Sequence, residues 1–255
     1  MLEYQEQVLM DCREERSSIV TGQMNLFGGE SEAVRETPIP SLPELERSAL
    51  LQLEHESLGL YLSGHPLEQS QWLRQLCRAT PAAALSEQPD GGKVLLIVTL
   101  QHVKQHTTKK GETMCFLTCE DQSGSADCVV FPALYNSVKP YLQQDAVLYL
   151  RGKISQKENA VSVLCDSVLQ EEAFFRTLSQ GRLCVKIDSR QTAELQQLLA
   201  VMGQHAGNVP VCFYLTDRKK MLSPRGGQAV AVNSESYAAL CAVVSPEQVG
   251  FLPPA

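Results

Sequence analysis

The stretch from Gly92 to Leu169 limits the possible folds more than any other part of the sequence. Within it, short apolar segments alternate with polar turns, and one helical segment follows the third of them. The predicted strands are Lys93–Val103, Met114–Cys119, Ala126–Phe131, Val147–Ile154 and Ala160–Leu164. Pro132 suits the first turn of a helix, and the apolar spacing after it predicts a helix of about ten residues.

Three strands, a helix and two more strands are the element order of an OB-fold, a small barrel that mostly holds single-stranded nucleic acid. We therefore predict a mixed α+β chain with a helical and linker segment, a five-stranded OB-fold barrel and a small α+β domain. The predicted boundaries are 1–42 for a terminal helix and flexible linker, 43–91 for a helical connector, 92–170 for the barrel and 182–252 for the small domain. Residues 171–181 are expected to form a polar connection.

The flanking parts are predicted in less detail. In the connector, a helix is expected from Pro43 to Leu58, ended by Gly59, with a short helix around Trp72. The small domain is expected to hold strands at Leu183–Ile187, Val209–Leu215, Gln228–Val232 and Gln248–Leu252, with helices over 195–202 and Asn233–Val243. Asp188 and Ser189 are candidates for capping the first of these helices.

Charge is distributed unevenly along the chain. The formal net charge is −7, which argues against a nucleic-acid binder whose whole surface is basic. Residues 92–168 hold eight Lys and Arg against seven Asp and Glu, about +1, so the rest of the chain carries about −8. A basic face is therefore expected on the barrel alone.

The cysteines indicate the redox compartment of the protein, and the lengths of its apolar runs indicate whether it could span a membrane. Nine scattered cysteines, an odd number, predict reduced thiols in a cytoplasmic protein rather than a disulfide framework. Their spacing matches no zinc-ligand pattern, so no metal site is expected. No apolar run approaches the roughly 20 residues of a membrane span, and no membrane partner is expected.

The first 42 residues combine a charged helical segment with a linker. Met1–Ser18 is typical of the last helix of a larger unit, in which case Met1 is not the natural start; the alternative is a short helix packed on the barrel. Thr21–Leu42 has the composition of a linker, but it contains the apolar sequence Gln23-Met24-Asn25-Leu26-Phe27. Such a sequence predicts a docking peptide, or a loop whose Leu26 and Phe27 pack on a neighbour.

Two motifs resemble a known family. Gln23-Met24-Asn25-Leu26-Phe27 is similar to the bacterial sliding-clamp binding peptide, in which a Gln binds the rim of a pocket and Leu-Phe fills its floor. Glu54–Gly59 followed by Leu60-Tyr61-Leu62-Ser63-Gly64-His65-Pro66-Leu67 resembles the segment before the OB domain in the alpha subunit of bacterial replicative DNA polymerase III, the C-family polymerase. The resemblance extends from about Gly22 to Phe251.

The resemblance implies a DNA-directed DNA polymerase, a nucleotidyltransferase of DNA replication, whose catalytic parts are absent here. The family's palm holds aspartates that bind Mg²⁺, and nothing in this chain supplies converging carboxylates of that kind. No catalytic residue and no cofactor are therefore assigned to this chain. His65, between Gly and Pro in a turn, is expected to be structural. The resemblance also implies that the small domain contacts the clamp-loader subunit.

The nucleic-acid face is expected on strands two and three and on the loop between strands one and two. That loop carries Lys104, Lys109 and Lys110, and the alternatives are cations that attract phosphate or a merely solvated loop. Phe116 is either a platform for base stacking or a core residue. Arg151 and Lys153 share one face of the fourth strand and are expected to extend the track of cations.

These observations lead to one functional hypothesis and one alternative. The hypothesis is a non-catalytic, C-terminal portion of a replicative polymerase alpha subunit. It would bind single-stranded template through its OB-fold and the sliding clamp through Gln23, Met24, Leu26 and Phe27. The alternative is a free-standing OB-fold protein that binds single-stranded DNA or tRNA.

Overall fold

The computed structural model describes residues 45–59, 61–157, 160–224 and 226–253. The predicted helix, linker and docking peptide of residues 1–42 lie outside the described residues.

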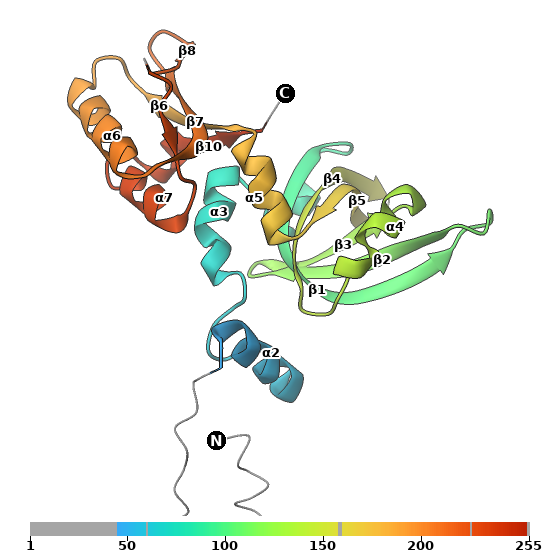
Figure 1. Cartoon of the computed structure of the whole chain (residues 1–255). Coiled ribbons are helices and arrows are strands. Elements are labelled where there is room, and N and C mark those ends of the chain that lie inside the picture. The colour runs from blue at the N-terminus through green and yellow to red at the C-terminus, as the bar shows by residue number, and fades with distance from the viewer. Residues whose placement is uncertain (1–44, 60, 158–159, 225, 254–255) are drawn as a thin grey trace, which may run out of the picture. The chain divides into compact units, whose positions relative to one another are not determined.

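The predicted five-stranded barrel is confirmed. It closes in the strand order β1-β2-β3-β5-β4 (Figure 1). Its strands are β1 Lys93–Thr107, β2 Thr113–Asp121, β3 Gly124–Val130, β4 Val147–Lys157 and β5 Ala160–Leu169. Between β3 and β4 lie α4 Pro132–Val138 and the 3-10 turn η4 Lys139–Tyr141, where the sequence predicts a helix.

Four strands, β1, β2, β4 and β5, extend beyond their predicted ends, β1 and β5 by the most. β1 continues four residues beyond Val103, because the backbone of this exposed polar segment still pairs with β2. A register shift between Leu100 and His102 lets the first half of β1 pair with β4 and the second half with β2. The end of β5 lies at Leu169 rather than Leu164. At the end of β1 the exposed polar positions carry no apolar alternation, so the sequence pattern stops before the strand does. The end of β5 instead contains the buried Cys165 and Val168.

The interior of the barrel is filled by alternate residues of each strand. Buried side chains here include Leu96, Val98, Leu100, Cys115, Leu117, Cys128, Leu148, Leu150 and Val163. Because successive side chains point to opposite faces of a strand, their sequence neighbours face outward. This alternation decides which side chains of β1 and β2 are presented on the outside.

The connector is helical, as predicted. α2 Arg47–Leu58 begins four residues later than the predicted Pro43, and Gly59 ends it with a φ of 72°. The 3-10 turn η2 Glu68–Ser70 leads into α3 Gln71–Cys77, which contains Trp72. A further 3-10 segment, η3 Ala82–Glu87, is not predicted from the sequence.

The expected polar connection after the barrel is wrong. Residues Glu171–Ser179 form a helix, α5. Phe174 and Leu178 lie four positions apart on one of its faces and are buried. Phe174 stacks on Tyr149 of β4, with ring centroids 4.5 Å apart. Two apolar anchors four residues apart are enough for a helix that packs on a preformed barrel, although they are too few to dominate the local composition.

The small domain holds a mixed sheet flanked by helices. Its strands are β6 Arg182–Ile187, β7 Ala206–Leu215, β8 Lys220–Leu222, β9 Ala229–Val230 and β10 Val249–Leu252. Its helical elements are α6 Thr192–Gln204, α7 Ser234–Cys241 and η5 Pro246–Gln248. The order β10-β6-β7-β8 places β8, which is not predicted from the sequence, at an edge, and β9 pairs with β7.

The predicted caps of α6 are also wrong. The residue before α6 is Gln191, and no side chain caps this helix. Asp188 instead accepts hydrogen bonds from Arg190, and the Ser189 hydroxyl donates to Asp217 at 2.5 Å, which ties two neighbouring loops together. The second helix is capped by Asn233, whose side chain accepts from the Ser236 backbone N–H at 2.8 Å.

A second hydrophobic core joins the small domain to the outside of the barrel. It includes Phe174 of α5, the inner residues of β6 and β7, and the outward-facing Ile97 and Tyr149 of the barrel. The eight cysteines that the structure describes are free thiols. None of the described helices is long and apolar enough to cross a bilayer, and the described side chains form no cluster of three or more metal-ligating groups.

Candidate nucleic-acid interface

The β1–β2 hairpin carries the candidate interface on its outer face. Cys115 and Leu117 point into the barrel and are fully buried, so Phe116 between them faces outward. In the register of the two strands Lys104 lies directly opposite Phe116. The structure therefore brings together one predicted cation and the predicted stacking residue, with their side chains on the same face.

Phe116 is exposed and is not a core residue. Its exposed fraction is 43%, which rules out the alternative that this phenylalanine belongs to the interior. The imidazole of His106 lies beside it, with ring centroids 6.2 Å apart and the planes tilted by 58°. On the other side, β3 places Val129 opposite Phe116. An exposed ring held between two neighbours is a suitable surface for a nucleobase.

A second exposed aromatic residue was not predicted. Phe131, directly after β3, is 45% exposed. Val130 before it is fully buried and pairs with Cys115, so Phe131 follows on the outward side of the sheet, beyond the last paired residue. The sequence assigns Phe131 to the last position of the third predicted strand and gives it no role in binding. The signal that could have found it is the alternation along β3, which places every second residue outside.

The loop at the tip of the hairpin presents two lysines to solvent. Lys109 and Lys110 are exposed, and neither makes an ion pair with any residue that the structure describes. The turn is held by the Gly111 N–H, which donates to the Thr108 carbonyl at 2.9 Å, and by the Thr108 N–H, which donates to the Glu112 carbonyl at 2.8 Å. Gly111 has a φ of 80°, a conformation that favours glycine.

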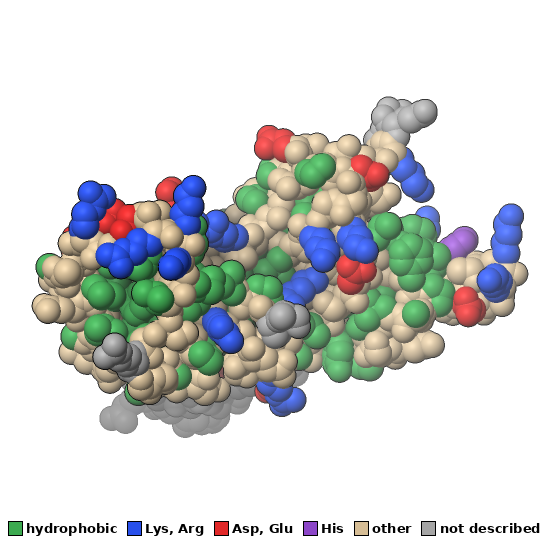
Figure 2. All heavy atoms as spheres, turned by 90° about the horizontal axis from the view of Figure 1, so that it is seen from above, with side chains coloured by type: hydrophobic (Ala, Val, Ile, Leu, Met, Phe, Trp, Pro, Cys, Tyr) green, Lys and Arg blue, Asp and Glu red, His purple; other side chains and the backbone are tan. Residues whose placement is uncertain are grey.

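Figure 2 shows the same order on the surface of the barrel. Exposed hydrophobic side chains gather next to a histidine at the base of the β1–β2 hairpin, and Lys or Arg side chains stand at the far end of the hairpin. Phosphate-attracting charge and apolar stacking surface are thus neighbours on one face.

Arg151 and Lys153 do not join this face. They lie on β4 opposite Leu95 and Lys93, near the start of β1. Leu95 is nine positions before Lys104, which corresponds to about 30 Å along a strand. The guanidinium of Arg151 lies 5.7 Å from the centre of the Phe174 ring of α5, a cation–π contact. The sequence pattern correctly places both cations on one face of β4, but packing of α5 on that strand gives Arg151 a partner within the chain.

The outward-facing side chains of β2 change from aromatic to polar and then to acidic along the strand. Phe116, Thr118 and Glu120 all point outward, and Thr118 donates a weak hydrogen bond of 3.4 Å to Asp127 of β3. Lys109 and Lys110 lie at the tip of the hairpin, together with the exposed Glu112, and Glu120 lies toward its base. A strand bound here would have its phosphates attracted to the tip end.

His65 has a structural environment. Its Nδ1 accepts the Leu67 backbone N–H at 3.1 Å, which stabilises the turn after α2. Burial lowers the pKa of His65, and the charge of Arg74 lowers it further against the opposing effects of nearby carboxylates. A neutral imidazole that serves as a turn acceptor agrees with the structural role expected from the sequence.

Comparisons with known proteins agree with the barrel and extend beyond it. The family described as OB-fold nucleic acid binding domain matches residues 94–170. A DNA polymerase III subunit alpha of Bacillus subtilis is 29% identical over 204 residues, which cover 78% of this chain and 18% of the relative. One from Saccharopolyspora erythraea is 26% identical over 234 residues, covering 85% of this chain and 19% of the relative.

Among solved structures, a domain of replication protein A from Methanococcus maripaludis covers 33% of this chain and 89% of its own, with 12% identity and a TM-score of 0.29. The chain spans about a fifth of the length of the curated relatives that it matches. It is therefore similar, over about four-fifths of its own length, to one part of the DNA polymerase III alpha subunits, and that part includes an OB-fold nucleic-acid-binding domain.

Proposed function

We propose that this chain is a non-catalytic, C-terminal portion of a replicative DNA polymerase of the polymerase III alpha type, and that its barrel holds single-stranded template DNA during replication. The observation that carries the proposal is the outer face of the β1–β2 hairpin, where Lys104 lies opposite the exposed ring of Phe116. The similarity to polymerase III alpha subunits supports the context of DNA replication.

The chemistry of this face favours a single strand over a duplex. Exposed rings can stack on bases only when the bases are unpaired, and stacking on an aromatic side chain contributes roughly 1–3 kcal/mol per base. The lysines attract phosphates without reading a base sequence. Binding is therefore expected to be tolerant of sequence, modest in affinity and strongly dependent on salt.

The test is equilibrium binding of fluorescently labelled oligothymidylate, measured by fluorescence anisotropy between low and high salt. The proposal predicts saturable binding that weakens steeply with salt, and weaker binding to a blunt duplex of the same length. Equal affinity for the duplex, or no binding to the single strand at low salt, would remove its basis.

Docking on the sliding clamp is a separate part of the proposal and rests on the sequence alone. Gln23, Met24, Leu26 and Phe27 would enter a pocket of the bacterial clamp as an extended peptide. Replacing Leu26 and Phe27 together by Ala should abolish binding to immobilised clamp. The matched control is replacement of the apolar Val34 and Ile39 of the same linker, which should leave clamp binding unchanged; equal effects of both pairs would contradict the assignment.

A contact of the small domain with a clamp-loader subunit is the third part. Met221 and Leu222 on the edge strand β8 are 50% and 49% exposed, so they offer apolar surface without a cost in packing. Replacing both by Glu should weaken binding of the clamp-loader subunit to the full chain without affecting oligothymidylate. Undiminished binding would place this contact elsewhere on the chain.

A further inference from the structure

A groove lies at the end of β1 that is opposite the hairpin tip. It has a volume of about 430 Å³ and is lined by the end of α3, the start of β1, and parts of β4 and β5. The charged side chains of its lining are those of Arg78, Lys93, Arg151 and Asp166. Cations therefore outnumber acids by three to one in this groove.

Two lysines face each other beside the groove. Lys93 of β1 lies directly opposite Lys153 of β4 in the register of the two strands. Their sequence neighbours Val94 and Ile154 are buried in the barrel, so both lysines point outward on one face, and both are exposed. Like charges directly opposite each other on paired strands are destabilising. A bound anion would relieve this repulsion.

Arg151 adds a third positive charge to the same face. It lies opposite Leu95, two positions from each lysine along its own strand, and diagonal neighbours of this kind are about 7–8 Å apart. The ring of Phe174 lies 5.7 Å from its guanidinium, which orders the side chain but does not neutralise its charge. Three cations are thus close enough to contact the oxygens of one phosphate or of two successive ones.

The charges of these cations are not compensated within the described part of the chain, where none of them forms an ion pair. Arg78 donates to the Glu247 backbone carbonyl at 3.1 Å, a contact that positions the guanidinium and leaves it charged. Asp166 is exposed and is likewise not ion-paired with any residue that the structure describes. The hydroxyls of Thr80 and Ser167 also line the groove and can donate to phosphate oxygens.

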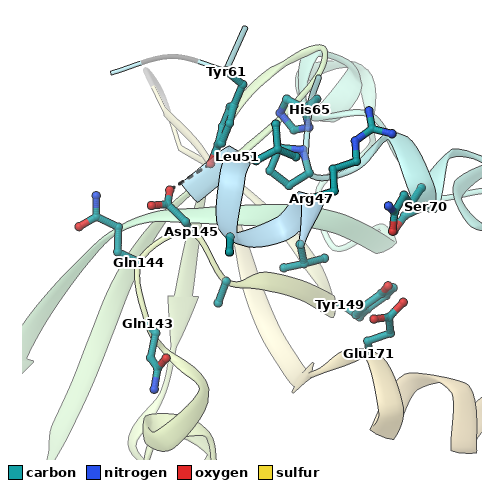
Figure 3. Close-up of a pocket in the computed structure, with 15 residues that line it drawn as sticks. Arg47, Leu51, Tyr61, His65, Ser70, Gln143, Gln144, Asp145, Tyr149 and Glu171 are labelled. Carbon is teal, nitrogen blue, oxygen red and sulfur yellow. Dashed lines mark hydrogen bonds between the residues drawn. The ribbon is translucent and has the colours of Figure 1, made fainter. Parts of the chain in front are cut away.

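A second cavity, beside α2, has the opposite character. Figure 3 shows Tyr61 and Asp145 at one end of it and Glu171 at the other. The Tyr61 hydroxyl donates to Asp145 at 3.2 Å, and Arg47 in its wall is paired with Glu68 at 2.7 Å. The acidic groups of this cavity would repel an anion, so the groove at the start of β1 is the better site for one.

The groove is separate from the face of Phe116. Lys93 lies eleven positions before Lys104, which corresponds to about 36 Å along a strand. Between them, the outward-facing Ile97 is buried in the core that joins the small domain to the barrel, and Thr99 is fully buried. The outer side of β1 is therefore not one continuous binding surface, and each end can be altered without the other.

We propose that the groove, with Arg78, Lys93, Arg151 and Lys153, binds phosphate groups of a DNA backbone as a second contact, independent of the stacking face. Among the described residues, no aromatic side chain lines this groove, so binding there does not require unpaired bases. The groove accepts a duplex as well as a single strand. The inference goes beyond the proposed function, because it assigns the weaker binding of duplex DNA to a different part of the chain.

The first experiment measures binding of a short, fluorescently labelled blunt duplex by anisotropy at several salt concentrations. Replacing Lys93 and Lys153 together by Gln should lower the affinity and reduce the slope of log affinity against log salt by about 1.8, because each neutralised duplex phosphate contributes about 0.9. The thermal unfolding temperature should stay the same or rise, because a like-charge pair is removed. Replacing Lys219 and Lys220 by Gln is the matched control and should leave the slope unchanged.

The outcomes separate this inference from the proposed function. Phe116→Ala should weaken binding of oligothymidylate and leave duplex binding unchanged. Duplex binding that is unchanged by the loss of Lys93 and Lys153, or reduced equally by the control pair, would overturn the groove inference. The proposed function would still stand if Phe116→Ala weakened the binding of oligothymidylate. No duplex binding by the wild-type chain would also overturn the inference.

The second experiment separates a DNA backbone from a small free phosphate compound as the ligand. Sodium pyrophosphate is titrated into the wild-type chain at constant ionic strength, and the heat of binding is measured. The inference predicts no saturable binding at micromolar concentrations, because the cations are spread along an open groove. Saturable binding that is abolished by Lys93→Gln with Lys153→Gln would assign the groove to a small anion and overturn the inference.

Discussion

Phe116 is the single residue on which the binding face depends most. Replacing it by Ala should lower the affinity for oligothymidylate by about 1–3 kcal/mol, because a stacking platform for one base is lost. The free energy of unfolding should change little, since 43% of the side chain is exposed already. Fluorescence anisotropy and urea unfolding measure the two quantities.

Leu222→Ala provides the control for this change. Leu222 is 49% exposed and lies on β8 of the small domain, so it removes a similar exposed apolar surface at another place. It should leave oligothymidylate binding unchanged. If both variants bound as tightly as the wild type, Phe116 would have no part in the interface.

Asp121 is the residue on which the attachment of the connector to the barrel depends. Its carboxylate is 3% exposed and accepts hydrogen bonds from Arg74 of α3, from the Ala82 N–H at 3.1 Å and from the Ser123 N–H at 2.7 Å. Asp121→Asn should lower the free energy of unfolding by about 2–4 kcal/mol, because Arg74 loses its charged partner in a largely buried position. Asp188→Asn, at an exposed ion pair, should have little effect.

The same carboxylate predicts a dependence of stability on pH. Burial alone would raise the pKa of Asp121, but the hydrogen bonds from Ser123 and Ala82 and the charge of Arg74 outweigh it, so the pKa lies below its usual value. The stabilisation is therefore complete above the unfolded pKa of about 3.9 and is lost as the pH falls through the lowered folded pKa. Urea unfolding at successive pH values should show wild type and Asp121→Asn converging only in acid. A constant difference down to the lowest pH would contradict this.

The β1–β2 hairpin is the element that should determine the electrostatics of binding. Each phosphate neutralised in a single strand contributes a slope of about 0.7 to the dependence of log affinity on log salt. Replacing Lys109 and Lys110 together by Ala should therefore reduce that slope by about 1.4. Lys219 and Lys220, adjacent lysines near the tip of the β7–β8 hairpin, form the matched control pair. An equal loss from both pairs would indicate general charge attraction rather than a binding hairpin.

Helices and strands could be predicted from the sequence where apolar residues alternate regularly. They could not be predicted where they depend on packing partners that are distant in the chain. The barrel strands could be predicted because their inward residues alternate around one core. The last residues of β1 could not, because they are exposed and only their backbone pairs with β2. Helix α5 was missed because its helical face is defined by Tyr149 of β4, a partner more than twenty residues away in the chain.

Some residues of the candidate interface could be predicted from the sequence and others could not, for the same physical reasons. The sequence assigns Lys104 to the loop between the first two strands, but β1 continues to Thr107 and places Lys104 on the strand, opposite Phe116. Arg151 was expected to extend that face, but its orientation toward Phe174 depends on the unpredicted α5. Phe131 was missed because a single apolar residue at the end of a strand can face either the core or the solvent. The sequence pattern does not distinguish these two orientations.

At the scale of the described molecule, two cores separate the binding face from the rest. One core fills the barrel, and the other joins α5 and the small domain to the outer residues Ile97 and Tyr149. The outer side of β4 is thereby used for packing, and the outer side of the β1–β2 hairpin is left exposed. A chain with a formal net charge of −7 can therefore still carry a local face with unpaired lysines.

Hydrogen–deuterium exchange with and without saturating oligothymidylate tests this division most directly. The account predicts slower exchange in the presence of the strand over the hairpin from His102 to Thr118 and around Phe131, and unchanged exchange in β6, β7 and β10 of the small domain. Protection confined to the small domain, or spread evenly over the chain, would contradict the claim that the outer face of β1 and β2 binds the strand.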